Sequence, residues 1–215
     1  RSKVYHINNG VDLEQFDYNT EHFRVDDPDL DDPNTFKVVY TGSIRKANGL
    51  GILVDAAKAI RDPRIKILVW GEGDEREELT RRVMEEGLTN IVFKGKVEKK
   101  YVPSIVSRAD LNLVHWGEVH LIQYGVSYNK LFDYMAAGRP IFSTVRPGYS
   151  IWEKYDCGRD TEDPRPEPLA HELEKMAALP PEELSRLGEN ARKGAEDYDF
   201  RVLTQKLLNV IGEIE

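Results

Sequence analysis

A chain of 215 residues with 40% hydrophobic residues can bury one sizeable core or two small ones. Its net charge of −8 argues against nucleic acids and anionic membrane surfaces as partners, since the chain has no basic stripe to replace counterions. No apolar run reaches the roughly 18–20 residues that span a bilayer, and the single cysteine, Cys157, excludes an internal disulfide and favours a reducing, cytoplasmic compartment.

Hydrophobic runs alternate with helical patterns from residue 36 onward. The runs predict buried strands at residues 36–41, 65–70, 90–93, 111–115 and 140–145. The patterns between them predict helices at residues 49–60, 75–87, 101–109 and 127–138, the last with Ser127 as its N-cap. This alternation predicts an α/β fold with a doubly wound, Rossmann-like parallel sheet, whose ligands bind at the carboxyl ends of the strands.

The last third of the chain has a different composition. Residues 159–168 contain three prolines and predict a loop, and helical patterns follow at residues 168–178, 181–196 and 200–213. We therefore divide the chain into an interdomain segment, a Rossmann-like core and C-terminal helices that pack on the same domain, at residues 1–20, 21–160 and 161–215. The sequence opens at Arg1 with neither a start methionine nor a signal peptide, and we interpret it as a fragment of a longer protein.

An acidic run, DDPDLDD, occupies residues 26–32. The spacing of its aspartates imitates the start of a calcium-binding loop, but Asp32 and Val38 stand where that loop needs glycine and glutamate. The run therefore predicts a solvated acidic loop rather than a metal site.

The loops that follow the first three strands are candidates for ligand contact. In TGSIRKANG (41–49), small residues such as Gly42 and Ser43 would let backbone N–H groups approach an anion, although an ordinary turn has the same composition. GEGD, after the second strand, lacks the third glycine of a dinucleotide fingerprint and predicts a tight turn. KGKVEKKY (94–101) either offers backbone groups to a flat base or holds solvated lysines.

The loop at residues 115–130 is long and holds His115, Trp116 and Tyr124, and its histidines lack zinc spacing with any cysteine. It leads into the helix that carries Lys130 at its third position, where a cation typically costs about 0.3–1 kcal/mol. That cost disappears if an anion occupies the helix N-terminus, and Asp133, one turn on, could accept the two hydroxyls of a ribose. Together they suggest a nucleoside diphosphate; the alternative is that the two side chains neutralise each other at the surface.

These motifs resemble the C-terminal, donor-binding half of glycosyltransferase family 4 (group 1), enzymes of the two-domain B-type (GT-B) fold. The resemblance covers nearly the whole chain, and its most specific piece is GVSYNKLFDYMAAGRPIF (125–142), which is similar to the branch that builds capsules, O-antigens and exopolysaccharides. KVYHINNGVD, YTGSIRKANGLGILVDAAK, ILVWGEGDEREEL, NIVFKGKV and VSRADLNLV follow in family order.

The resemblance implies roles for single residues. Asp133 stands at the family's ribose-binding carboxylate, whereas Gly125 replaces the glutamate that touches the donor sugar, for which Glu118 or His120 could substitute. The family's phosphate-binding arginine and lysine fall on Ser43 and Asn48, which shifts that role to Lys130, with Arg45 or Lys46 as alternatives. The donor-binding set implied in this way is Gly42, Ser43, Asn48, Lys96, Val97, Gly125, Val126, Ser127, Asn129, Lys130 and Asp133.

The expected function is sugar transfer from a nucleotide sugar, UDP being the expected nucleotide, to a glycan or polyprenol-linked acceptor, with retention at the anomeric carbon. The resemblance implies neither a metal nor a cofactor, and it implies an N-terminal acceptor domain as partner, through which the enzyme could lie at the inner face of the membrane. Two alternatives stay open: a UDP-sugar 2-epimerase of the same fold, and a non-catalytic partner subunit that has kept the fold.

Overall fold

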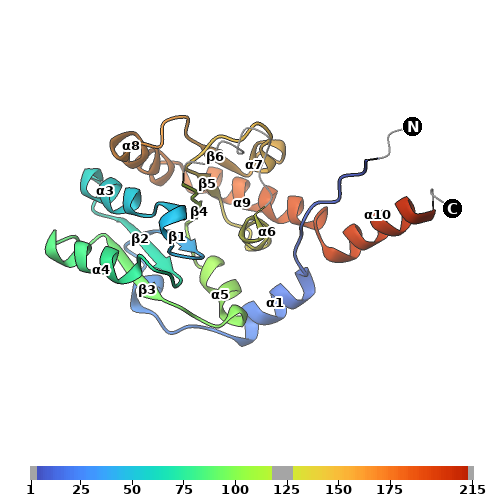
Figure 1. The fold of residues 1–215 in the computed structure, drawn as a ribbon, viewed down its shortest axis with the longest axis horizontal. Coiled ribbons are helices and arrows are strands. Elements are labelled where there is room, and N and C mark those ends of the chain that lie inside the picture. Colours follow the sequence, from blue (N-terminus) through green and yellow to red (C-terminus); the bar gives the residue numbers. More distant parts are fainter. Residues whose placement is uncertain (1–3, 118–127, 213–215) are drawn as a thin grey trace.

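The computed structural model describes residues 4–117 and 128–212, and its centre is a six-stranded parallel sheet (Figure 1). The strands are β1 Phe36–Thr41, β2 Ile65–Trp70, β3 Ile91–Gly95, β4 Leu111–Val114, β5 Ile141–Ser143 and β6 Gly158–Asp160. Their order in the sheet is β3-β2-β1-β4-β5-β6, so the strand order reverses between β1 and β4. In open α/β sheets, ligands bind at the carboxyl ends of the strands beside such a reversal.

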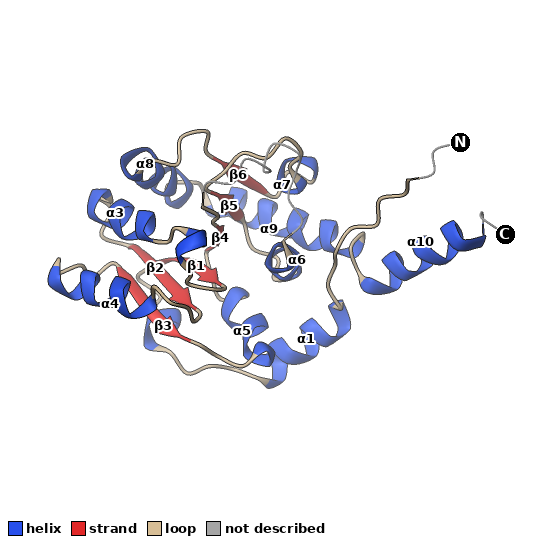
Figure 2. Cartoon of the chain, viewed as in Figure 1, coloured by secondary structure: helices blue, strands red, loops and turns tan. Residues whose placement is uncertain are grey.

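Helices cover both faces of the sheet (Figure 2). They are α1 Leu13–His22, α2 Pro28–Asp31, α3 Gly51–Ala59, α4 Arg76–Glu85, α5 Val102–Val106, α6 Asn129–Ala136, α7 Ile151–Lys154, α8 Pro166–Ala177, α9 Pro181–Glu196 and α10 Phe200–Gly212, with short 3-10 helices η1 Lys46–Asn48 and η2 Lys99–Tyr101. Alternate residues of β1 face opposite sides: Val38 and Tyr40 join the apolar cluster under α3, α4 and α8, and Val39 joins the one under α1, α5, α6 and α9. The predicted doubly wound α/β fold is confirmed.

The structure adds a strand that the sequence reading placed in a loop. β6 pairs in parallel with β5, with Gly158 opposite Ile141. A Cβ atom at position 158 would overlap the Ile141 carbonyl, so the glycine allows the two strands to approach. The prediction of a loop from residue 159 was wrong in its first residues, because this edge strand, Gly-Arg-Asp, has no apolar run to reveal it.

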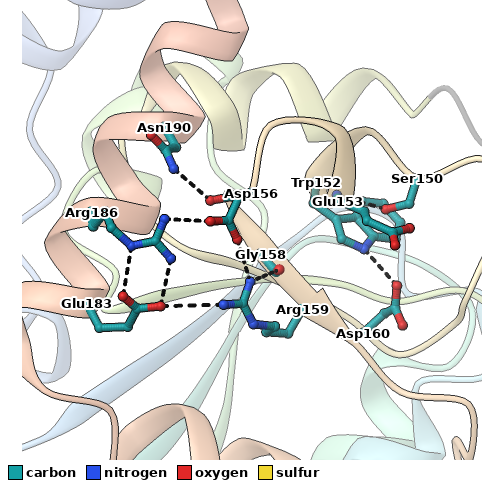
Figure 3. A network of polar contacts seen from close by, with 10 residues as sticks. All are labelled: Ser150, Trp152, Glu153, Asp156, Gly158, Arg159, Asp160, Glu183, Arg186 and Asn190. Atoms are coloured by element: carbon teal, nitrogen blue, oxygen red, sulfur yellow. Dashed lines mark hydrogen bonds and ion pairs between the residues drawn. The ribbon is translucent and has the colours of Figure 1, made fainter.

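Charged side chains fasten α9 to the turn before β6 (Figure 3). Asp156, the residue at φ 47° in that turn, accepts from Arg159 at 3.0 Å and from Arg186 of α9 at 2.5 Å. Glu183 bridges the two arginines, and the Asn190 amide donates to the Asp156 carbonyl at 3.0 Å. The turn is therefore held from the α9 side through both its carboxylate and its backbone.

The acidic run is not the solvated loop that the sequence predicts. Asp27 caps α2, and its carboxylate also pairs with Lys94 of β3 at 2.8 Å. Asp29 pairs with Lys94 and with Lys66 of β2, and Asp31 pairs with Arg108 at 2.9 Å. The prediction failed because the lysines that receive these carboxylates lie far away in the sequence, on neighbouring strands.

The C-terminal helices differ in how they pack. α8 packs against α3, and α9 packs against α6. α10 extends away from the body (Figure 1), and among its described residues only Leu203 is buried. Its exposed apolar side chains are Phe200, Val202, Leu207, Leu208 and Ile211. Within residues 4–117 and 128–212, no helix is both long and apolar enough to cross a membrane.

Candidate functional site

Three adjoining cavities form one cleft at the carboxyl ends of β1, β2 and β3. The first, of about 390 Å³, lies over the ends of these strands; the second, of about 470 Å³, extends to the start of α6; the third, of about 410 Å³, lies between α1 and α6. Lys99 and Val102 line all three, and Asp133 lines the second and third. We call this continuous space the switch-point cleft, because it opens where the strand order reverses.

The floor of the cleft is made by two loops packed backbone against backbone. The Gly42 N–H donates to the Trp70 carbonyl at 2.9 Å, and the Ile44 N–H donates to the Glu72 carbonyl at 2.9 Å. A Cβ atom at Gly71, whose φ is 156°, would overlap the Gly42 carbonyl. Residues 71–73 therefore run alongside the loop after β1, and their glycines serve this close contact. The turn comes at Asp74 and Glu75, so the prediction of a tight turn across GEGD was wrong for its first three residues.

These contacts also decide which N–H donors are free in residues 42–48, which we call the phosphate loop. Gly42 uses its N–H within the floor, but the Ser43 N–H has no hydrogen-bond partner among the described residues. A Cβ atom at Gly42 would lie 2.5 Å from the Lys130 ammonium nitrogen. The missing side chain of Gly42 leaves room for Lys130 in its observed position, and Ser43 can offer a backbone donor to an anion.

Lys130 lies at the second position of α6, one position earlier than predicted, because the helix begins at Asn129 with Tyr128 as N-cap. Its Nζ atom lies 3.9 Å from the centroid of the Tyr40 ring. Burial lowers the pKa of Lys130 to about 7. No carboxylate among the described residues forms an ion pair with it, so its ammonium faces the cleft without a negative partner.

Asp133 lies one turn further along α6 and faces the same cleft. Burial raises the pKa of Asp133 to about 6, and the positive charge of Lys99 offsets part of this effect. Within the described residues no ion pair joins Asp133 to Lys130. Mutual neutralisation, the alternative that the sequence left open, is therefore not what the structure shows.

The other predicted donor residues are distributed unevenly around the cleft. Lys96 and Val97 line its first cavity, and Asn129 lines the second and third. Asn48 lies behind the phosphate loop, where its amide donates to the Ser43 carbonyl at 2.7 Å and to the Ser43 hydroxyl at 3.0 Å. The remaining predicted contacts fall outside the described residues: Glu118, His120, Gly125, Val126 and Ser127.

Tyr134 and Lys99 were missed by the sequence reading. β1 pairs with β4 only at Val38 and Val39, so the Thr41 N–H has no strand partner and donates instead to the Tyr134 hydroxyl at 2.8 Å. This bond ties α6 to the end of β1. Nothing in the sequence signals it, because tyrosine at a helical apolar position is ordinary core; Lys99 looked like a solvated lysine.

His115 is buried and supports the end of the phosphate loop. Burial lowers the pKa of His115 to about 4, so the ring is neutral. With Nε2 assigned as the protonated nitrogen, it donates to the Gly49 carbonyl at 3.3 Å, and Nδ1 accepts from the Thr144 hydroxyl at 2.7 Å. Both ring nitrogens are occupied, which suits a structural brace.

Comparisons with known proteins agree with this fold. Over 99% of its length the chain is 23% identical to the "Putative teichuronic acid biosynthesis glycosyltransferase TuaH" of Bacillus subtilis, of which it covers 51%. It is 28% identical to the "Putative colanic acid biosynthesis glycosyl transferase WcaI" of Escherichia coli over 86 residues, 40% of this chain and 21% of that protein. The chain thus spans about half the length of the first of these relatives and a smaller part of the second.

Solved structures share the fold at low identity. A glycosyltransferase from Rickettsia africae superposes with a TM-score of 0.78 at 16% identity, over 99% of this chain and 57% of that one. Anabaena HepE in complex with UDP gives 0.75 at 17% identity, over 96% and 57%. These neighbours confirm the expected fold, one Rossmann-like half of the GT-B arrangement. The sequence profile "Glycosyl transferases group 1" matches residues 35–178, which include the strand ends, the phosphate loop and α6, and the chain therefore belongs to the group 1 glycosyltransferases.

Proposed function

We propose that this chain is the donor-binding half of a glycosyltransferase that transfers a sugar from a UDP-sugar to a glycan or polyprenol-linked acceptor in cell-surface polysaccharide synthesis. The observation that carries the proposal is a pair of ionisable groups at the switch-point cleft that have no ion-pair partner among the described residues. Lys130 and Asp133 face it without neutralising each other, although burial disfavours the charge on each. The names of the TuaH and WcaI relatives support polysaccharide synthesis, and the UDP complex of the Anabaena neighbour supports the nucleotide.

The nucleotide would lie along the cleft in a defined order. The first cavity, beside Lys96 and Val97, suits the flat base. Asp133 would accept the ribose hydroxyls, and Lys130 with the Ser43 N–H would bind the diphosphate. This order places the ammonium at the group that carries the anionic charge.

Transfer would then depend on electrostatic stabilisation of the leaving diphosphate. As the bond to the sugar breaks, negative charge grows on the diphosphate, and Lys130 together with the N-terminal N–H groups of α6 would stabilise it. We propose retention of configuration at the anomeric carbon, as in the family that the sequence resembles.

The acceptor side is proposed to lie on a second half of the enzyme. The chain covers 51% of TuaH and 57% of the Anabaena structure, so these proteins contain a comparable length that it does not match. We propose that this other half binds the acceptor, and that its contacts bring the enzyme to the cytoplasmic face of the membrane. The residues 1–215 alone should therefore bind a nucleotide without transferring its sugar.

Calorimetric titration of the chain with UDP, uridine and 2′-deoxy-UDP tests the proposal. We expect UDP to bind more tightly than uridine, because only UDP meets Lys130, and more tightly than 2′-deoxy-UDP, because Asp133 then loses a hydroxyl. Lys175→Ala, which removes a surface lysine of α8, is the matched control and should bind like the wild type.

Three results would contradict the proposal. A chain that binds no UDP would favour the non-catalytic subunit, and efficient sugar transfer by residues 1–215 would show that no second half is needed. Conversion of the UDP-sugar to its 2-epimer would favour the epimerase alternative.

A further inference from the structure

We propose that Tyr40 is a positioning residue for the donor diphosphate: its ring holds the Lys130 ammonium at the phosphate loop (residues 42–48), where the anion would bind. The inference rests on the proposed function, because it assumes that Lys130 binds the diphosphate. The sequence gives Tyr40 no such role, since it reads as one more apolar residue of a buried strand.

The contacts of Tyr40 fix its ring in place. It is fully buried at the end of β1, and its hydroxyl donates to the Ser43 carbonyl at 3.1 Å and accepts from the Asn48 amide at 3.4 Å. The Lys130 Nζ atom lies 3.9 Å from the ring centroid, well inside the roughly 6 Å range of cation–π attraction. The ring therefore joins the phosphate loop and the ammonium into one unit.

The surroundings of Lys130 offer little else to hold a cation. His115, after β4, is neutral, and Lys99, on η2, adds a second positive charge to the same cleft. Asp133 and Tyr128, from its own helix region, line the cleft but form no ion pair or hydrogen bond with it within the described part of the chain. Among the described residues, the Tyr40 ring is thus the group that stabilises the ammonium.

This contact has a consequence that depends on pH. Burial lowers the pKa of Lys130 to about 7, so at pH 8 the free chain carries mostly the neutral amine, while the diphosphate complex requires the ammonium. The ring stabilises the ammonium in the complex but not the neutral amine. At pH 6 both states carry the ammonium and both gain from the ring. Weakening the ring's attraction should therefore weaken UDP binding much more at pH 8 than at pH 6.

Fluorination of the ring provides a test that changes its shape very little. Tyr40→Phe keeps the ring and removes the hydroxyl, and a trifluorinated phenylalanine at position 40 then withdraws electron density from the ring face. UDP and uridine are titrated into each protein at pH 6 and pH 8. From the usual size of a desolvated cation–π contact, we expect about fivefold to 25-fold weaker UDP binding at pH 8 for the fluorinated ring than for Phe. We expect no matching change at pH 6 or for uridine.

The possible results distinguish the proposed role of the Tyr40 ring from the proposed function on which it rests. UDP affinity at pH 8 that does not respond to fluorination would overturn the role of the ring, as would a loss shared equally by both pH values or by uridine. A wild-type chain that binds no UDP would overturn the proposed function and this inference with it. Comparing the two rings at each pH cancels the titration of Asp133 and of UDP itself.

Discussion

Two groups of partly buried charges in this protein are treated in opposite ways. At the β3 edge of the sheet, Lys94 lies between Asp27 and Asp29 at 2.8 and 2.5 Å. At the switch-point cleft, burial disfavours the charges of Lys130 and Asp133, and neither has such a partner among the described residues. A fold that can pair its buried charges in one place and leaves them unpaired in another identifies the second place as the one with room for a charged ligand.

The pKa values express the same contrast. Burial raises the pKa of Asp29, but hydrogen bonds from Lys66 and Lys94 outweigh it and hold the pKa below its usual range. Burial lowers the pKa of Lys94, and its bonds to Asp27 and Asp29 reverse that effect. At the cleft, few interactions with described residues counteract the effect of burial on the pKa. The charged forms of Lys130 and Asp133 are therefore both disfavoured.

The largest effect is expected from a substitution that removes the lysine of the paired cluster at the β3 edge. Lys94→Ala leaves two carboxylates, whose side chains are only 12% and 22% exposed, without their shared cation. We expect a loss of about 2–4 kcal/mol in the free energy of unfolding, measured by urea denaturation at pH 7, because Asp27 is left without a cation and Asp29 keeps only Lys66. The UDP affinity of the folded variant, measured without urea, should not change.

Lys175→Ala is the control for this change. It breaks a surface pair with Glu172 and should cost about 0–1 kcal/mol. A Lys94→Ala variant as stable as this control would mean that the β3-edge cluster contributes no more than an exposed pair, and the contrast between the two regions would disappear.

Asp133→Asn, in the switch-point cleft, should raise the stability of the chain at pH 7 rather than lower it. The folded-state pKa of Asp133 is about 6 and its ordinary value is 3.8, so its contribution to stability is present below pH 3.8 and lost as the pH rises through 6. The variant should therefore be more stable than the wild type at pH 7, by about 1–2 kcal/mol after allowance for solvent, and equal to it near pH 3.5. Thermal denaturation at both pH values measures the difference.

The same variant should bind UDP more weakly. Losing the charge that accepts two ribose hydroxyls should cost about 1.5–3 kcal/mol in affinity. A variant that is destabilised at pH 7 and binds UDP normally would show that Asp133 is a structural residue.

A smaller expected effect is the uptake of protons when UDP binds. Because the Lys130 pKa is about 7 in the free chain and a bound diphosphate would raise it, UDP binding at pH 8 should take up protons, up to about one per site. Titrations in buffers of different ionisation enthalpy measure that number. The diphosphate itself is fully ionised there, since its last pKa is about 6, so an uptake of zero at pH 8 would contradict the unpaired ammonium.

The smallest expected effect lies on α10. Its exposed apolar face contrasts with both charged regions, since it contributes little to the described fold. Leu207→Ser and Leu208→Ser should change the free energy of unfolding of the chain by about 0.5 kcal/mol or less, because these side chains are 45% and 54% exposed. A loss as large as that of Lys94→Ala would show that α10 packs on the body in solution.

The fold was largely predictable because its strands are apolar and its helices periodic. Lys130 stood out for a local reason, its place at the positive end of a helix, and Asp133 for its position one turn on. Gly42 was chosen as a backbone donor to the anion, whereas its N–H is used in the floor of the cleft and its missing side chain makes room for Lys130.

What the sequence could not show depends on contacts between distant segments. The pairing of Asp27 and Asp29 with Lys94 spans more than 60 residues, and the Tyr134 hydroxyl meets Thr41 across 93. Neither periodicity nor composition records such contacts. α1, α2 and α7 were missed for a related reason: they are short or polar, and their stability comes from capping and packing rather than from a long apolar stripe.

Lys130, which has no ion-pair partner among the described residues, is proposed to bind the diphosphate, and Lys130→Met tests this role because methionine keeps the apolar stem. The melting temperature and the affinities for UDP and uridine are measured at pH 6.5, where the wild-type side chain is largely charged. We expect the unliganded variant to be at least as stable as the wild type, with unchanged uridine affinity and UDP binding weakened by about 1.5–3 kcal/mol. A lower melting temperature together with equal losses for UDP and uridine would contradict it.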